Sequence, residues 1–227
     1  SRMNKNSPKG ICGVNIGPNK DNAKDVNDYV LCFDQFCKIA SYITINISSP
    51  NTPGLRQQHK DENITKLIDE LHIRRSERSS NVPILFKVSP DINDEEIDSL
   101  CRIFLDKKVD GLILTNTSIS KKESLTSANR IEEGGLSGPP IENLSNLLIK
   151  KFYTRLNAKI PIIGAGGVGD GKSAFDKIKS GASLIQLYTS LVYEGPFVAN
   201  KINRELSSIL KLNGIENISD AIGIDCN

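Results

Sequence analysis

Two serines and two asparagines stand together at the end of an apolar, β-branched run at residues 42–47. They are Asn46, Ser48, Ser49 and Asn51. A run of this kind predicts a buried strand. Polar side chains are costly to bury without partners, so those at the end of such a strand usually face a site. Their types predict a site that holds its ligand through hydrogen bonds to hydroxyl and amide groups.

A lysine, Lys87, lies inside another apolar run, at residues 83–89. An isolated ammonium is very costly in a core, so this lysine is either paired with a carboxylate or in contact with a ligand. No other predicted strand end carries an acidic residue, and an electron-rich ligand is therefore the expected partner. Schiff-base chemistry remains an alternative for this residue taken alone. A phosphate-sugar isomerase or lyase built on it would need a carboxylate at a strand end, and none is visible.

A glycine-rich turn follows the apolar residues at 161–165 and leads into a helical segment. Glycines let backbone N–H groups approach a phosphate closely, and the start of the following helix favours an anion. The stretch matches neither a P-loop nor a dinucleotide fingerprint. In a barrel, the phosphate site uses the loops after the last two strands. We therefore expect a phosphate site at Gly166, Gly167, Tyr188, Thr189 and Ser190, although a tight turn without a ligand would have the same composition.

Further polar groups occur at other predicted strand ends and in one long loop. The loop at 126–145 contains Ser137 and Gly138 in a GGLSG string, which could contact a phosphate or a sugar chain, or could simply be a flexible loop. Asn15 and Asn116 are neutral amides at strand ends. Each can donate and accept, which suits a heterocycle with alternating C=O and N–H groups.

Composition excludes several other classes of protein. The 29 Lys+Arg and 27 Asp+Glu give a net charge of +2, and no basic stripe with interleaved aromatics predicts a nucleic-acid partner. Five cysteines without a CxxC pair and two histidines cannot form a zinc site of ordinary spacing, so we expect no metal and a reducing compartment. His59 and His72 lie in polar segments, which argues against a Ser–His–Asp set. No apolar run is long enough for a transmembrane helix, and the first ten residues lack the apolar part of a signal peptide.

The elements that must position these residues alternate along the chain. Apolar runs that predict strands lie at 11–17, 42–48, 83–89, 111–116, 161–167 and 183–189, and segments with helical periodicity lie at 23–39, 64–75, 94–105, 141–156, 172–179 and 197–212. This alternation predicts parallel strands covered on both faces. An open doubly wound sheet carries its site at one switch point, whereas here nearly every strand ends in polar or glycine groups. We therefore predict one α/β domain over residues 1–227, a (β/α)8 TIM barrel.

The number of strands is too small for a complete barrel. The fold needs eight strands and normally takes about 250 residues, whereas six runs are found. We expect an incomplete barrel that lacks roughly its first two βα units. Exposed strand edges and apolar surface at the missing sector should favour aggregation.

Eight strings, in order along the chain, resemble the dihydroorotate dehydrogenases, specifically class 2, the quinone-linked branch. They are GVNIG (13–17), NISSPNTPGLR (46–56), ILFKVSPD (84–91), DGLILTNTS (110–118), GGLSG (134–138), PIIGAGGV (161–168), GASLIQLYTSLVYEGP (181–196) and DAIG (220–223). Each would be weak alone. Together they cover nearly the whole chain and are highly specific.

The resemblance implies a barrel that holds FMN and oxidises dihydroorotate to orotate in pyrimidine synthesis. A base removes a proton from C5, hydride passes from C6 to flavin N5, and a quinone reoxidises the flavin. By position, Ser49 is similar to the catalytic base, and a serine there in place of a cysteine marks class 2. The positions that align with substrate contacts are Asn46, Asn51, Asn116 and Thr117, and those that align with flavin contacts are Asn15, Asn46, Lys87, Thr115, Ser137, Gly138, Gly166, Gly167, Tyr188 and Thr189.

The sequence departs from the family pattern at its N-terminus. Two βα units, with an Ala-Gly turn that binds flavin and a lysine that contacts substrate, are absent, as are the helices that form the quinone tunnel and dock on a membrane. We expect weak FMN binding and little or no turnover by this chain. A location at the mitochondrial inner membrane, or at the inner membrane of a bacterium, follows from the resemblance, with membrane contact only through the absent segment.

Two alternatives to this interpretation remain. A class 1 enzyme, or an FMN barrel of the dihydropyrimidine dehydrogenase type, would carry cysteine at the position of Ser49. A non-catalytic fragment or pseudoenzyme of the same barrel would keep the strings above without turnover. The open reading frame upstream of the chain would discriminate this second alternative.

Overall fold

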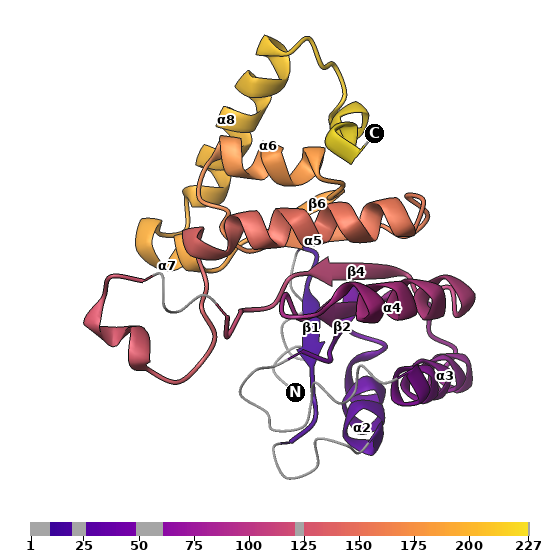
Figure 1. The fold of residues 1–227 in the computed structure, drawn as a ribbon. Helices are drawn as coiled ribbons and strands as arrows, with labels where there is room; N and C mark the ends of the chain where they lie inside the picture. Colours follow the sequence, from indigo (N-terminus) through magenta and orange to yellow (C-terminus); the bar gives the residue numbers. More distant parts are fainter. Residues whose placement is uncertain (1–9, 20–25, 49–60, 121–124, 227) are drawn as a thin grey trace.

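The computed structural model describes residues 10–19, 26–48, 61–120 and 125–226 (Figure 1). Within these residues the strands are β1 (Gly13–Ile16), β2 (Tyr42–Asn46), β3 (Ile84–Val88), β4 (Gly111–Leu114), β5 (Ile162–Ala165) and β6 (Leu184–Gln186). The helices are α2 (Val26–Phe36), α3 (Asp61–Glu77), α4 (Asp94–Asp106), α5 (Glu142–Arg155), α6 (Gly171–Lys179), α7 (Thr189–Glu194) and α8 (Val198–Leu212). Short 3-10 helices are η4 (Ala128–Ile131), η5 (Pro139–Ile141), η6 (Ile218–Ala221) and η7 (Ile224–Cys226).

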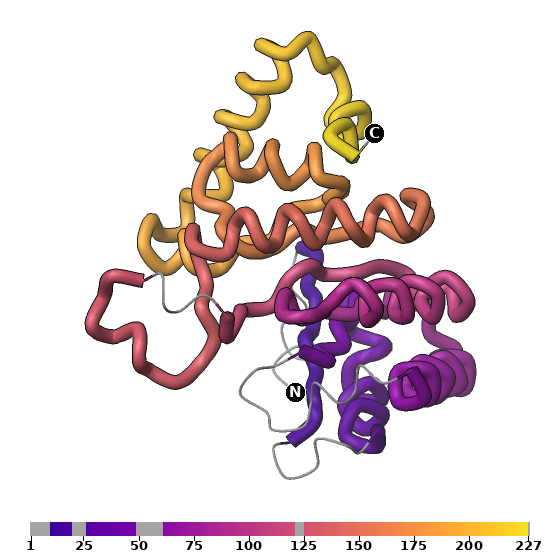
Figure 2. The backbone as a smooth tube through the Cα atoms, viewed as in Figure 1, coloured from indigo at the N-terminus to yellow at the C-terminus, as the bar shows by residue number. Residues whose placement is uncertain are grey.

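The strands form one parallel sheet whose spatial order is the order of the sequence, from β1 to β6. A doubly wound sheet would reverse its order at a switch point, whereas a barrel does not. The predicted barrel class is therefore confirmed over these six strands. Consecutive helices pack against one another from α2 to α6, and α6 packs on α8. Figures 1 and 2 show them following in this order from the indigo end of the chain to the yellow end.

Alternate residues of each strand face opposite sides of the sheet, and the two sides differ in character. The side toward the helices is the main core, which includes Ile43, Ile45, Phe86, Phe104 and Phe152. The other side, which is the inner face of the barrel, has a small apolar layer of Leu85, Ile113 and Ala165, with Tyr42 and Ile163 packed against it. The same alternation turns the polar residues Asn46, Lys87 and Gln186 toward the inner face.

Two helices begin with a capping box, which fixes where the loops before them end. Asn93 caps α4: its side chain accepts from the Glu96 N–H at 2.9 Å, and the Glu96 carboxylate accepts from the Asn93 N–H at 2.9 Å. Asp170 caps α6 in the same way through Ser173. Such reciprocal pairs satisfy N–H groups that a helix cannot satisfy itself.

The predicted strands and helices all exist, with strand ends one to three residues shorter than the apolar runs. One prediction was wrong: the last strand was expected to continue through Thr189. It ends at Gln186, and Thr189 begins α7, with Tyr188 as its N-cap. Strand β6 is paired only with β5 in the described sheet, so nothing holds the longer run extended. None of the helices in the described ranges is both long and apolar enough to cross a membrane. That the chain is one domain over residues 1–227 stays a prediction.

Candidate functional site

A cavity of about 770 Å³ lies at the carboxyl ends of the strands. Parallel strands bring their carboxyl ends to the same edge of a sheet, where ligand sites of such folds are found. Twelve of the predicted site residues line this cavity, namely Asn15, Lys87, Thr115, Asn116, Thr117, Ser137, Gly138, Gly166, Gly167, Tyr188, Thr189 and Ser190. Residues from segments far apart in the sequence therefore meet at one place.

Three other predicted site residues are not among those that line the cavity. Asn46 does not line the cavity but lies next to it, since its Oδ1 accepts a hydrogen bond of 3.2 Å from Asn116 Nδ2. The predicted base, Ser49, and the predicted substrate contact, Asn51, lie outside the described residues.

A network of side-chain hydrogen bonds joins the ends of β2, β3 and β4. Ser48 is fully buried, and its hydroxyl donates to the backbone carbonyl of Lys87 at 2.8 Å. Asn116 Nδ2 donates to the Ser48 hydroxyl at 3.1 Å as well as to Asn46 Oδ1. Asn116 Oδ1 accepts from the backbone N–H of Thr117 at 2.9 Å. The two carboxamides are therefore held in one orientation each.

The end of β2 is also held from the outer side of the sheet. The hydroxyl of Tyr29, a fully buried residue of α2, donates to the backbone carbonyl of Asn46 at 2.8 Å. Burial raises the pKa of this phenol far above its usual value, so Tyr29 stays a neutral donor at any physiological pH.

Lys87 projects from β3 toward the inner face, where it lies in register between Asn46 of β2 and Ile113 of β4. Its side chain is half-buried, and burial lowers the pKa of its ammonium below the usual lysine value. No carboxylate of the described residues forms an ion pair with it. A partly desolvated cation beside a cavity suits an electron-rich or anionic ligand.

The part of the cavity that follows β5 is formed by glycines whose backbone conformation is unfavourable for other residues. Gly166 and Gly167 have φ of +109° and +83°. A Cβ on Gly167 would lie 2.4 Å from Glu142 Cβ, because the turn packs directly on the start of α5. In the described part of the chain, the backbone N–H groups of Gly166, Gly167 and Val168 donate to no protein acceptor. Such a row of open N–H groups is suited to an anion.

The start of α6 does not contribute to an anion site as the sequence predicted. Its first N–H groups are already taken by two carboxylates: Gly171 N donates to Glu205 Oε2 at 2.7 Å and Ser173 N donates to Asp170 Oδ1 at 2.7 Å. The side chains near the glycine turn that could contact an anion are instead those of Thr189, after β6, and Ser137. The Thr189 hydroxyl donates to the Ser137 hydroxyl at 3.0 Å. The groups here that are suited to an anion are therefore the N–H groups of the turn and these hydroxyls.

Gln186 lines the cavity and was not predicted from the sequence. Its Oε1 is buried and has no hydrogen-bond partner among the described residues. Buried polar atoms are nearly always paired, so an unpaired one beside a cavity indicates a ligand that supplies the donor. The signal in the sequence was a polar residue on the inner side of an otherwise apolar strand.

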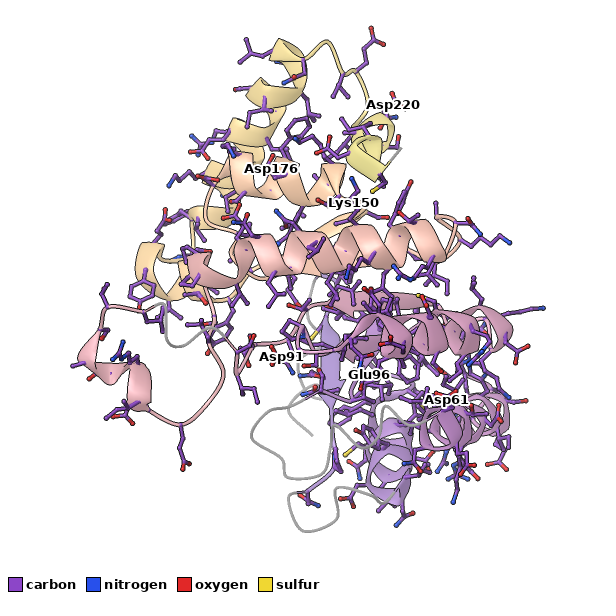
Figure 3. All side chains as sticks on the ribbon, viewed as in Figure 1. Asp61, Asp91, Glu96, Lys150, Asp176 and Asp220 are labelled. Carbon is purple, nitrogen blue, oxygen red and sulfur yellow. The ribbon has the colours of Figure 1, made fainter. Side chains whose placement is uncertain are left out.

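Asp91 also escaped prediction as a residue of the site. The carboxylate of Asp91, which is labelled in Figure 3, lies in the loop after β3. It accepts from the hydroxyls of Ser118 and Ser120 and, at 2.9 Å, from the backbone N–H of Ile119. Ser118 in turn pairs with Leu136 through two backbone hydrogen bonds, of 3.0 and 2.6 Å. Asp91 thus fixes the loop that carries Asn116 and Thr117 and joins it to the loop that carries Ser137 and Gly138.

Comparison with known proteins gives consistent results. The family model described as dihydroorotate dehydrogenase matches residues 1–210. A relative from Bradyrhizobium diazoefficiens, named dihydroorotate dehydrogenase (quinone), is 41% identical over 221 residues, which make up 95% of this chain and 60% of the relative. A protein of the same name from Parvibaculum lavamentivorans is 38% identical over 218 residues, 96% of this chain and 62% of the relative.

A solved structure gives the same similarity in three dimensions. The crystal structure of DHODH in complex with ferulenol from Eimeria tenella superposes with a TM-score of 0.91 at 35% identity, covering 96% of this chain and 63% of that chain. The chain therefore spans about three fifths of the length of the curated relatives it matches.

Proposed function

The chain belongs to the dihydroorotate dehydrogenase family, and on that premise we propose that it forms the cofactor-binding part of a quinone-linked, FMN-dependent enzyme that oxidises dihydroorotate to orotate. FMN, when bound, would take the hydride from C6 of dihydroorotate and pass the electrons to a quinone. The observation that carries the proposal is that one cavity is lined both by Lys87, which no described carboxylate pairs, and by a glycine turn whose N–H groups donate to no acceptor among the described residues.

The lining residues fit FMN by their chemistry. The open N–H groups of Gly166 and Gly167, with the hydroxyls of Ser137 and Thr189, would hold the phosphate. Lys87 would lie beside the ring system, where its ammonium stabilises extra negative charge. The unpaired Oε1 of Gln186 would accept from an N–H or hydroxyl of the cofactor.

The substrate would lie over the amide end of the site. Asn46 and Asn116 are oriented by mutual hydrogen bonds, and together with Thr117 they would bind the ring and carboxylate of dihydroorotate. Ser49, which follows the buried Ser48, is proposed to accept the C5 proton. A free hydroxyl is a weak base, so the site must relay or stabilise that proton. Asn51 is proposed as a further substrate contact.

The electron acceptor implies a lipid surface as partner. Both curated relatives reported above are named for a quinone, and we infer that the whole protein uses one too. Lipid quinones reside in membranes, so we propose association with a membrane through a segment other than the described residues. Whether that membrane is mitochondrial or bacterial stays a prediction from the family resemblance.

The test is a visible absorption spectrum of the purified chain with FMN, before and after anaerobic addition of dihydroorotate. Flavin that stays bound and is bleached by dihydroorotate would establish the dehydrogenase half-reaction. Flavin that stays bound but is bleached neither in this chain nor in the protein encoded by the complete open reading frame would contradict the proposal in favour of a non-catalytic member of the family. The same pair of spectra on the protein encoded by the complete open reading frame serves as the comparison for affinity and extent of bleaching.

A further inference from the structure

One buried charge takes no part in the site as described so far. Lys177 of α6 is completely buried and is the one charged residue among the buried polar residues of the described chain. Its Nζ donates to Ser145 Oγ at 3.0 Å and to Asn146 Oδ1 at 2.8 Å, both on α5. No described carboxylate forms an ion pair with it. Burying an ammonium without a counter-ion is costly, and an apolar residue of similar length would avoid that cost.

The sheet is shaped to admit this side chain. Gly164 of β5 faces it: a Cβ at Gly164 would lie 3.0 Å from Lys177 Cδ and 2.9 Å from Ala182 Cβ. Gly164 does not line the cavity, in contrast to Gly166 and Gly167 two and three residues later. The first glycine of the GAGG string therefore makes room for the lysine, and the later two form the turn.

Two hydrogen bonds join the ammonium to the glycine turn. The Ser145 hydroxyl, which accepts from Lys177, donates to the backbone carbonyl of Ala165 at 2.6 Å. That carbonyl also accepts from the backbone N–H of Thr115 at 2.9 Å. Ala165 is the last residue of β5 and immediately precedes Gly166. The lysine therefore sets the direction of the Ser145 hydroxyl, because an ammonium can only donate and leaves the hydroxyl proton for Ala165.

The nearest acidic groups do not neutralise the charge. Asp176, labelled on the same helix in Figure 3, already forms ion pairs with Lys172 and Lys179. Glu142 acts on Lys177 only at longer range, and burial is the larger effect, lowering the pKa of the ammonium to about 8. The Nζ has two acceptors, Ser145 Oγ and Asn146 Oδ1, and the ammonium that donates to both carries its positive charge in a region of low dielectric constant, where charges act over longer distances than in water.

We propose that Lys177 is a positioning residue for the phosphate of the cofactor, holding Ser145 and the Ala165 carbonyl in place behind the Gly166–Gly167 turn and supplying positive charge that favours a dianion there. This inference rests on the proposed function, since it requires that the turn binds the phosphate of FMN. It adds a residue that touches neither cofactor nor substrate.

The test compares FMN with riboflavin, which lacks only the phosphate. Dissociation constants of both are measured by flavin fluorescence at pH 7 for the unchanged chain, K177M and K177Q. We expect both variants to weaken FMN binding roughly tenfold or more while changing riboflavin binding less than about threefold, since one lost charge interaction in a buried site is worth about one order of magnitude. K172M is the matched control: it removes a lysine of the same helix whose side chain is 79% exposed, and solvent screening should keep its effect below about twofold.

The other outcomes are distinguishable. Equal weakening of FMN and riboflavin in K177M, or no weakening of either, would overturn the role of Lys177 while leaving the proposed function intact. If the unchanged chain binds FMN no better than riboflavin, the turn is not a phosphate site, and the proposed function fails together with the inference.

A second measurement covers the case in which the lysine variants fold poorly. S145A keeps the ammonium but removes its link to Ala165, and we expect it to lower FMN affinity about threefold to tenfold with little effect on riboflavin. Thermal unfolding with and without inorganic phosphate complements this. Phosphate should stabilise the unchanged chain and K172M more than S145A, and equal stabilisation of all three would contradict the proposal.

Discussion

The hydroxyl of Ser48 donates a hydrogen bond of 2.8 Å to the backbone carbonyl of Lys87. This bond joins the end of β2 to β3 at the residue whose ammonium has no ion-pair partner among the described carboxylates. Asn116 reaches the same hydroxyl from the end of β4. Three consecutive strands therefore share one buried hydroxyl beneath the cavity, and the residue after it is the proposed base, Ser49.

Replacing that hydroxyl should cost both stability and function. In S48A, the Lys87 carbonyl loses its donor and Asn116 Nδ2 loses one acceptor, so we expect the free energy of unfolding to fall by about 1–3 kcal/mol. In the protein encoded by the complete open reading frame we also expect slower bleaching of bound flavin by dihydroorotate, because Asn116 Nδ2 keeps only one of its two acceptors. Urea unfolding and anaerobic stopped-flow absorbance measure the two effects. S208A, which removes an exposed hydroxyl on α8, should change stability by less than about 0.5 kcal/mol. Unchanged stability in S48A would show that water replaces the hydroxyl.

Lys87 should distinguish reduced from oxidised flavin. In K87M we expect the dissociation constant of reduced, anionic FMN to rise about tenfold more than that of oxidised FMN, because only the reduced form gains from a cation beside the ring. The apoprotein should be no less stable, since the ammonium is desolvated and unpaired among the described residues. Titrations with oxidised and chemically reduced FMN measure both constants. K159M, which alters an exposed lysine after α5, is the control. An equal change in the two constants would mean that Lys87 does not face the ring.

Much of the fold and of the site could be predicted because the signals are local. Strands that are apolar on nearly every residue predicted the parallel sheet, and polar or glycine residues at the strand ends predicted the barrel and eight of the lining residues. Ser137 and Gly138 were predicted from the glycine-rich string of a long loop, and Thr117 was predicted only from the family resemblance. The roles of Ser49 and Asn51 could not be tested, since both lie outside the described residues.

What escaped prediction depends on contacts distant in the sequence. Glu205 occupies the first N–H of α6 from 34 positions away, so the expected anion site at that helix start was wrong. Lys177 stands in a segment with Lys172 and Lys179 that has the composition of a surface helix, and nothing local marks it as buried. Gly164 belongs to the same string as Gly166 and Gly167, yet only packing against Lys177 shows that it has a different role.

The glycine turn offers a matched pair of substitutions. In G167A, the alanine would have to adopt the left-handed backbone conformation of Gly167, with φ of +83°. Its Cβ would lie 2.4 Å from Glu142 Cβ. We expect the free energy of unfolding to fall by about 2 kcal/mol and FMN binding to weaken at least tenfold. In G169A, nothing lies within 4 Å of the new Cβ, and we expect a change within about 1 kcal/mol. Urea unfolding and fluorescence titration are the measurements. Similar effects in both variants would mean that the turn rearranges without cost.

A cluster of ions on the outer side should govern stability in acid. Asp34 of α2 accepts hydrogen bonds from Arg78, directly after α3, and from Arg74 of α3. These bonds, that from Arg78 above all, outweigh the effect of burial and lower the pKa of the Asp34 carboxyl to about 2. Because the folded pKa lies below the usual value near 3.8, the unfolded chain binds more protons between these limits. The stabilisation is therefore fully present above about pH 4 and is lost as the pH falls toward 2.

The variant D34N isolates this contribution. At pH 7 we expect the unchanged chain to be about 1–2 kcal/mol more stable than D34N, less than the full pKa shift implies because Arg78 is 44% exposed and solvent screens its charge. The difference should shrink steadily below pH 4 and disappear only as the pH falls through about 2, as followed by urea unfolding at each pH. D98N, which alters a carboxylate 65% exposed on α4, is the control for the loss of a surface charge. A constant difference between pH 7 and 2 would assign the effect of D34N to packing of α2 on α3. Helix α2 also carries Tyr29, whose hydroxyl donates to the backbone carbonyl of Asn46. Loosening of α2 in acid should therefore disturb the carboxamides of Asn46 and Asn116 before it disturbs the Gly166–Gly167 turn.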